Sequence, residues 1–149
     1  MMITNTNSLF KAATNPTIIK RTLSTIMATF EKKILKEGSG APPAKGANVT
    51  VEANLYLATP NKTRGTAIWS THQASGFLFP SAKITPFTYS SGTGGVITGW
   101  DDGVGTMKQG ERAELYIPWE HAYGADGHPG FKIPPKSPLI FEIEVMKIE

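Results

Sequence analysis

Segments in which apolar and polar residues alternate, with one short helix among them, most constrain the fold of this chain. The last such segment, residues 139–145, places its apolar side chains on one face, because successive side chains of a strand point to opposite faces. Residues 98–107 favour the one convincing helix. A sheet with one apolar face has to bury that face beneath another layer, and this helix is available to cover it. The sequence therefore predicts an α+β layer fold.

Five further segments favour strands, and stretches rich in glycine, proline and hydroxyl residues separate them. Residues 49–57 are rich in β-branched side chains and alternate early on, whereas residues 60–65 favour a loop and residues 90–95 a flexible turn. The predicted strands are residues 30–36, 49–57, 67–71 and 87–89 before the helix and 110–117 after it.

Length, charge and composition narrow the class of protein. The chain has 149 residues, enough for one sizeable core, and no apolar run long enough to span a bilayer, so we expect no membrane association. The net charge of +3 comes from the first 30 residues, because the remainder holds 12 basic and 12 acidic residues. A neutral body does not favour nucleic-acid binding. The absence of cysteine excludes disulfides, thiol nucleophiles and thiolate metal sites.

Residues 1–27 differ in composition from the rest of the chain. They contain Lys11, Lys20 and Arg21, no acidic residue and many hydroxyl side chains, a composition typical of a mitochondrial transit peptide. A disordered tail, or a second translation start at Met27 that yields a cytoplasmic protein, is the alternative. We therefore expect an N-terminal extension over residues 1–27, a folded domain over residues 28–149, and a mitochondrial location.

Four motifs follow one another in the second half of the chain. Residues 96–104 read Val-Ile-Thr-Gly-Trp-Asp-Asp-Gly-Val, residues 122–130 read Ala-Tyr-Gly-Ala-Asp-Gly-His-Pro-Gly, residues 133–135 read Ile-Pro-Pro, and the alternating segment 139–145 closes the series. In this order and at these spacings the motifs resemble the FKBP family of peptidyl-prolyl cis–trans isomerases, over residues 86–149. The resemblance implies a curved antiparallel sheet of about five strands wrapped on one short α-helix.

The chemistry that the resemblance implies needs little machinery. The barrier to prolyl isomerisation, about 18–20 kcal/mol, arises from amide resonance, so no other bond has to break and no nucleophile, metal or other cofactor is implied. A site that binds the twisted amide better than the planar one suffices. The resemblance implies that Tyr123, Trp100 and Phe141 are catalytic, with Trp100 at the pocket floor and Tyr123 donating its hydroxyl to a substrate carbonyl. The substrate-binding residues that it implies are Trp69, Phe87, Val96, Ile97, Ile133, His128 and Ser70.

Three positions depart from the family pattern. Ala53 and Ser70 stand where family enzymes usually carry tyrosine and aspartate, and no aspartate occurs before Asp101. Gly95 stands where the family usually has an acidic residue. We therefore expect reduced isomerase activity and weak binding of macrolides of the rapamycin type, with Trp69 partly filling the space beside Ala53.

The expected partners are polypeptides with Xaa-Pro bonds, and we expect a monomer that aids protein folding. The alternative is a non-catalytic chaperone or adaptor module that holds a proline-containing or apolar segment in the same pocket. A third reading, a carrier of small hydrophobic molecules, rests only on the apolar pocket. Each aromatic residue taken alone also fits an ordinary core position, and His128 fits an ordinary turn.

Several weaker signals do not change this interpretation. Residues 92–95 are glycine-rich but lack the lysine and hydroxyl residue of a phosphate-binding loop. The three histidines, His72, His121 and His128, do not have zinc-ligand spacing. Loops 58–67 and 73–85 are longer than in typical family members, and the second contains the apolar run 76–80, which either folds back onto the body or forms a partner surface.

Overall fold

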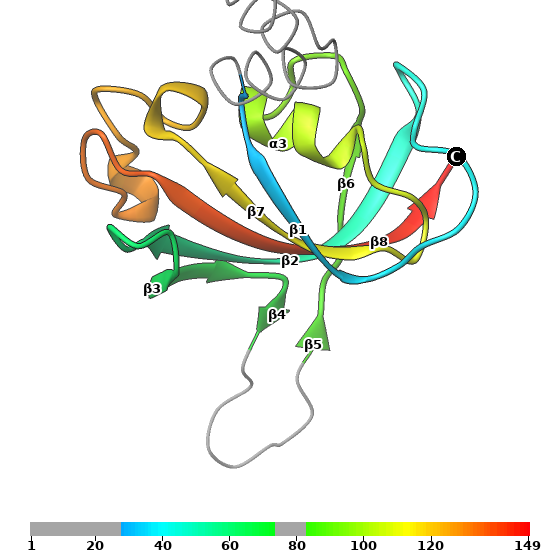
Figure 1. Cartoon of the computed structure of the whole chain (residues 1–149), viewed down its shortest axis with the longest axis horizontal. Helices are drawn as coiled ribbons and strands as arrows, with labels where there is room; N and C mark the ends of the chain where they lie inside the picture. The colour runs from blue at the N-terminus through cyan, green and yellow to red at the C-terminus, as the bar shows by residue number, and fades with distance from the viewer. Residues whose placement is uncertain (1–27, 74–82) are drawn as a thin grey trace, which may run out of the picture.

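Helix α3 (Thr98–Val104) lies on the concave side of a curved antiparallel sheet (Figure 1). The computed structural model describes residues 28–73 and 83–149. The strands of these residues are β1 (Glu31–Lys36), β2 (Asn48–Ala58), β3 (Arg64–Ser70), β4 (His72–Gln73), β5 (Lys83–Ile84), β6 (Phe87–Ser90), β7 (Arg112–Ile117) and β8 (Leu139–Ile148). The main sheet has the order β1-β7-β8-β2-β3, with β6 also paired to β2, and β4 pairs with β5 in a separate two-stranded sheet. The predicted α+β fold is confirmed.

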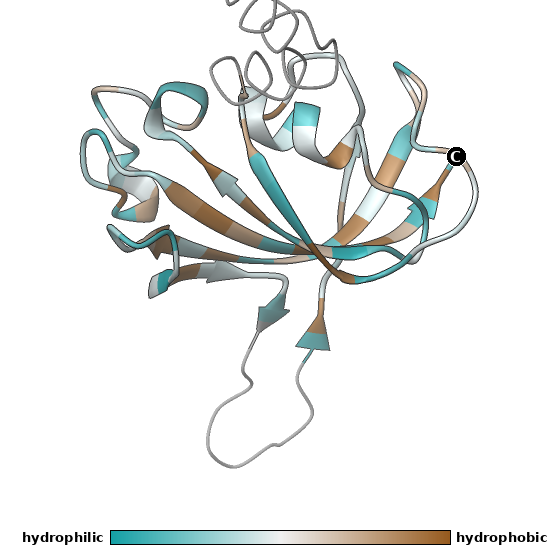
Figure 2. Cartoon of the chain, in the orientation of Figure 1, coloured by the Kyte–Doolittle hydropathy of each residue, from teal (hydrophilic) through white to brown (hydrophobic). Residues whose placement is uncertain are grey.

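The core lies between α3 and the two central strands, β2 and β8. Leu55 lies opposite Phe141, and Ala53 lies opposite Ile143, so that their side chains share the face that α3 covers. These four residues are between 0% and 4% exposed. Figure 2 shows the corresponding hydrophobic stretches along the middle of the sheet. The alternation in the sequence thus identifies the buried face of both strands. Among the described residues, no helix has the length and apolar character needed to cross a membrane.

Helix α3 ends three residues earlier than predicted. The sequence predicts a helix to Met107, but the helical segment ends at Val104 and Gly105 follows as its C-cap. Thr106 N donates to Gly103 O at 3.1 Å and Met107 N donates to Val104 O at 2.9 Å, bonds of the tighter 3₁₀ type. Two glycines in three residues lower the helix propensity there, which explains the early end.

Strand β3 begins inside the segment that the sequence predicts as a loop. Residues 60–65 contain several turn formers, yet Arg64 already pairs with Ala58 of β2. The Arg64 guanidinium binds Glu114 at 2.7 Å and lies over the ring of Tyr56. These long-range contacts hold the end of β3 against the sheet, and no local pattern in the sequence announces them. The apolar run 76–80 lies outside the described residues.

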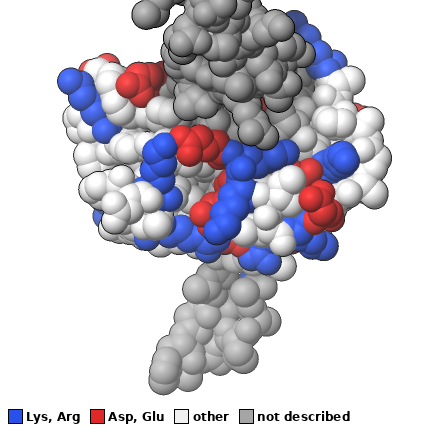
Figure 3. All heavy atoms as spheres, viewed as in Figure 1, with Lys and Arg blue, Asp and Glu red and all other residues white. Residues whose placement is uncertain are grey.

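Ion pairs cover the face of the sheet opposite α3. Glu142 lies between two core residues of β8, so its side chain points to the other face, where it is only 5% exposed. Its carboxylate binds Arg64 Nη1 at 2.6 Å and also binds Arg112. Glu144 pairs with Lys36 at 3.1 Å in a more exposed position. Basic and acidic side chains lie interspersed on the surface seen in Figure 3.

Replacing Glu142 with glutamine is expected to lower the free energy of unfolding by about 1–3 kcal/mol, because two guanidinium groups lose their shared, buried counter-charge. The matched control is Glu144→Gln, whose single ion pair is more exposed and is expected to contribute at most about 1 kcal/mol. Urea denaturation of both variants measures the difference. Equal destabilisation by the two substitutions would show that burial of Glu142 does not strengthen its ion pairs.

A candidate active site between the sheet and helix α3

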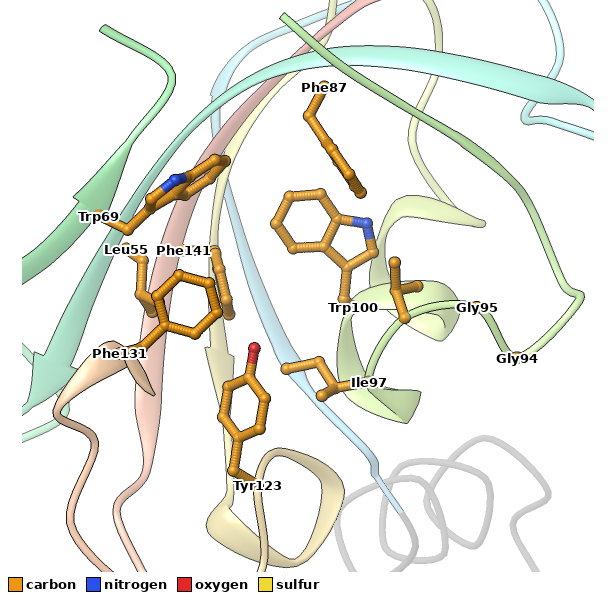
Figure 4. Close-up of a pocket in the computed structure, with 11 residues that line it drawn as sticks. Leu55, Trp69, Phe87, Gly94, Gly95, Ile97, Trp100, Tyr123, Phe131 and Phe141 are labelled. Carbon is orange, nitrogen blue, oxygen red and sulfur yellow. The ribbon is translucent and has the colours of Figure 1, made fainter. Parts of the chain in front are cut away.

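A cavity of about 470 Å³ opens between the sheet, helix α3 and the loops that follow β6 and β7 (Figure 4). Every described residue that lines it is uncharged. Figure 4 shows the Tyr123 hydroxyl directed into the space, and it also shows the indole nitrogens of Trp69 and Trp100. The lining residues are Leu55, Trp69, Phe87, Gly94, Gly95, Val96, Ile97, Trp100, Tyr123, Phe131 and Phe141.

Trp100 forms the floor of this cavity. It projects from α3, is 4% exposed, and meets the ring of Phe141 edge-on at 4.8 Å between ring centroids. Phe87 of β6 meets the same indole edge-on at 6.0 Å. Such perpendicular aromatic contacts are favourable and restrict the orientation of each ring. The floor is therefore a rigid apolar surface.

The wall formed by the glycine-rich turn depends on Asp101. Its carboxylate accepts hydrogen bonds from Gly92 N at 2.7 Å and Gly94 N at 3.3 Å. Gly94 has a φ of 76°, in the left-handed region that glycine adopts without strain. Asp101 follows Trp100 directly in α3, so the same short helix fixes both the pocket floor and this wall.

Tyr123 reaches the cavity from the loop that follows the 3₁₀ turn Trp119–His121. Burial raises the pKa of Tyr123 above its ordinary value. A raised pKa means that the neutral phenol persists to higher pH, so the hydroxyl remains a hydrogen-bond donor throughout the physiological range. Tyr123 thus offers the pocket a neutral hydroxyl donor, and none of the described lining residues carries a carboxylate.

Because the Tyr123 proton is lost only above the ordinary tyrosine pKa, the rate of a reaction that depends on this hydroxyl is expected to be flat between about pH 7 and pH 9. The contribution of Tyr123 is expected to disappear as the pH rises through its raised pKa, above about pH 10. A pH–rate profile tests this. A decline centred near neutral pH would show that a different group controls the reaction.

Three of the predicted site residues lie outside the cavity lining. Ser70 lies opposite Asn54 of β2, and its hydroxyl donates a hydrogen bond to Asn54 Oδ1. Ile133 is 3% exposed and belongs to the core beside the pocket. His128 meets the Tyr123 ring at 5.0 Å, and its Nδ1 accepts a hydrogen bond from Phe131 N at 3.1 Å. The structure brings together the other seven predicted residues: Trp69, Phe87, Val96, Ile97, Trp100, Tyr123 and Phe141.

Four lining residues were not predicted as site residues: Leu55, Gly94, Gly95 and Phe131. Leu55 lies two residues after Ala53 on the same face of β2, so strand alternation could have identified it. Phe131 ends the 3₁₀ turn Pro129–Phe131, and Lys132 after it adopts a left-handed conformation with φ 56°. No periodic pattern places the side chain of such a turn.

The residues of the cavity carry no metal ligands of the usual kinds. In ranges 28–73 and 83–149, no group of three or more His, Asp or Glu side chains gathers where it could hold a metal ion.

Comparisons with known proteins agree with the fold and the site. The family described as FKBP-type peptidyl-prolyl cis-trans isomerase matches residues 40–146. The chain is 40% identical to peptidyl-prolyl cis-trans isomerase FKBP12 of Vicia faba, over 80% of this chain and 97% of that protein. It is 41% identical to FK506-binding protein 1 of Gibberella zeae, over 79% of this chain and 96% of that protein.

Solved structures give the same result. The N-terminal domain of FKBP42 from Arabidopsis thaliana superposes with a TM-score of 0.68 at 27% identity, covering 83% of this chain and 89% of that chain. The structure of the three FKBP domains of wheat FKBP73 gives a TM-score of 0.66 at 32% identity, covering 81% of this chain and 46% of that chain. With a matching family over most of the chain and relatives near 40% identity, this protein belongs to the FKBP-type peptidyl-prolyl cis–trans isomerase family.

Proposed function

We propose that this isomerase acts on Xaa-Pro bonds by enclosing the proline ring in the uncharged aromatic pocket above Trp100. The observation that carries this mechanism is the lining itself, which is uncharged and mostly aromatic and aliphatic, with the Tyr123 hydroxyl directed into the space. The cavity of about 470 Å³ has room for a proline ring and parts of its neighbours, since ligand pockets usually lie between about 300 and 1,000 Å³.

An apolar pocket lowers the barrier by treating the two amide geometries differently. The planar amide is polar because resonance places partial charges on its oxygen and nitrogen, and water solvates those charges. The twisted amide loses that resonance and is less polar, so it loses less solvation when it enters the pocket. The pocket therefore favours the twisted geometry relative to the planar one, which is the condition for catalysis.

Tyr123 supplies orientation in this mechanism. Its hydroxyl donates a hydrogen bond to a carbonyl that flanks the rotating bond, and so holds one side of the peptide while the other side turns. The surrounding aromatic rings exclude water from that bond, which strengthens it. Since the raised pKa keeps the phenol neutral, the donor needs no activation by a neighbouring base.

Removing the Tyr123 hydroxyl by Tyr123→Phe is expected to lower kcat/KM by about two- to tenfold, because one neutral hydrogen bond contributes about 0.5–1.5 kcal/mol. The matched control is Tyr116→Phe, which removes a hydroxyl from a strand outside the cavity lining. Isomerisation of a short Xaa-Pro peptide measures both. Equal rates for Tyr123→Phe and the wild type would remove Tyr123 from the mechanism.

We also propose that turnover and macrolide affinity are lower than in family members that carry tyrosine and aspartate at the positions of Ala53 and Ser70. The proposal is supported by the uncharged lining, in which Gly95 provides no carboxylate, and by Ala53, a buried core residue whose methyl group provides no aromatic wall. Parallel measurement of kcat/KM and of rapamycin binding on such a family member tests it. Equal values for the two proteins would show that a pocket without a carboxylate is sufficient.

A cellular role is proposed from the sequence of the extension. Its basic, acid-free composition supports import into mitochondria, where the isomerase would act as a monomer on folding polypeptides. Mass spectrometry of the protein from its own cells tests the processing step: a mature chain that begins beyond Met27 fits cleavage or an internal start, and import of a tagged full chain separates the two. An intact N-terminus with a cytoplasmic location would contradict import.

A further inference from the structure

Two buried polar atoms beside the pocket floor make no hydrogen bond of standard distance and angle in the structure. In the part of the chain that the structure describes, the buried side-chain nitrogen and oxygen atoms that lack a hydrogen bond are Tyr89 Oη and Trp100 Nε1. Tyr89 is 8% exposed and Trp100 is 4% exposed, so water does not reach either freely. Native proteins pair nearly all such groups, and an exception at a functional site requires an explanation.

The two atoms belong to neighbouring rings with complementary chemistry. The Tyr89 and Trp100 rings meet edge-on, with 6.1 Å between their centroids and an interplanar angle of 75°. The indole nitrogen can only donate, whereas a phenolic oxygen can both accept and donate. Figure 4 shows the indole nitrogen turned toward Phe87, and Phe87 stacks on the ring of Tyr89 at 6.0 Å. The indole nitrogen of Trp100 therefore lies on the side of its ring where Phe87 and Tyr89 are stacked on each other.

The surroundings of the Tyr89 hydroxyl keep it in the form that this role requires. Burial raises the pKa of Tyr89 to about 12, and the charge of Asp101 acts in the same direction. The side chains of Trp100 and Ser91 act against this increase in the pKa of Tyr89. A hydroxyl that stays protonated can accept a hydrogen bond from Trp100 while it donates its own proton to another acceptor, such as the hydroxyl of the buried Ser91.

We propose that Tyr89 is a positioning residue for the isomerase reaction: its hydroxyl accepts a hydrogen bond from Nε1–H of Trp100 and fixes the indole in the orientation that forms the pocket floor. The inference rests on the proposed function, because it assigns to Trp100 the role of that floor. Asp101 supports the same arrangement from the next position of α3, since it holds the glycine-rich wall beside the indole. Tyr89 itself does not line the cavity and acts through Trp100.

The experiment compares Tyr89→Phe with Tyr116→Phe, a control that removes one hydroxyl elsewhere. Two-dimensional ¹H–¹⁵N spectra report the indole N–H groups of Trp69, Trp100 and Trp119, and single Trp→Phe variants assign the three signals. For Tyr89→Phe we expect the Trp100 signal to move upfield and the melting temperature to fall. We also expect kcat/KM to fall about three- to tenfold, because the transition state is stabilised less. The control is expected to leave the Trp100 signal and kcat/KM unchanged.

The direction in which the melting temperature changes shows whether the two groups are paired. If the two groups are paired, Tyr89→Phe leaves the indole N–H without an acceptor and lowers the melting temperature, and the effect is smaller when Trp100 has already been replaced by phenylalanine. If each is unpaired, the substitution removes a buried orphan group and raises the melting temperature. A raised melting temperature, an unmoved Trp100 signal or an unchanged kcat/KM would each overturn the proposal. Should the wild type show no isomerase activity, the proposed function fails, while the spectra and the melting temperatures still decide the hydrogen bond.

Discussion

Replacing Trp100 with leucine is expected to lower kcat/KM for proline peptides by about 10- to 100-fold, because the substrate ring loses the flat surface on which it lies. The substitution also removes the edge-on contacts with Phe141 and Phe87. Truncation of a large buried aromatic to a smaller residue leaves space that the neighbouring side chains fill only partly, so the free energy of unfolding is expected to fall by about 2–4 kcal/mol.

The control for this prediction is Trp119→Leu. Trp119 begins a 3₁₀ turn outside the cavity lining, and its ring contacts the ammonium group of Lys136 at 5.7 Å. We expect its replacement to leave kcat/KM within about twofold of the wild type, a difference of less than half a kcal/mol in transition-state binding. The kcat/KM values are measured at a temperature at which circular dichroism shows both variants to be folded. Similar rates for the two variants would contradict the role of Trp100 as pocket floor.

Replacing Gly99 with alanine is expected to destabilise the fold and displace the pocket floor. An added Cβ would lie 2.3 Å from Ile117 Cγ2 and 2.8 Å from the carbonyl oxygen of Thr29. Overpacking of this kind costs about 1–3 kcal/mol, and the higher helix propensity of alanine returns no more than about 1 kcal/mol. Since Trp100 is the next residue, any shift that relieves the contact moves the indole, and kcat/KM is expected to fall as well.

Gly95→Ala provides the matched control for stability. Its added Cβ would meet nothing closer than Thr93 Oγ1 at 3.8 Å, an ordinary contact distance. We expect the free energy of unfolding of this variant to stay within about 0.5 kcal/mol of the wild type. Denaturant titration of both variants gives the comparison. Equal stability of Gly99→Ala and Gly95→Ala would show that α3 can move away from β7 at no cost.

Much of the fold could be predicted because alternation reports directly which face of a strand is buried. Residues 139–145 illustrate this, since their alternating apolar side chains form the core side of β8. Alternation does not report the pairing of strands or its irregularities. The register of β2 and β3 shifts between Leu55 and Tyr56 and again between Tyr56 and Ala58, and these shifts depend on contacts with distant segments. The early start of β3 at Arg64 has the same origin.

The site could be predicted where its residues belong to regular elements or follow family motifs. Trp100, Phe141 and Phe87 project from a helix and two strands, and all three line the cavity. The placement of Ser70 and Phe131 could not be predicted in this way. Ser70 takes its position from the pairing of β3 with Asn54, and Phe131 takes its position from a turn in which Lys132 adopts a left-handed conformation. Both depend on tertiary context rather than on local pattern.

The most direct test of the central claim is prolyl isomerisation of a short Xaa-Pro peptide by the full chain. We expect a rate above the uncatalysed background that increases in proportion to protein concentration. We expect that rate to fall with both Tyr123→Phe and Trp100→Leu, while the controls Tyr116→Phe and Trp119→Leu retain it. A folded wild-type protein that gives no rate above background would contradict catalysis by this pocket and would leave a module that binds proline-containing segments without turning them over.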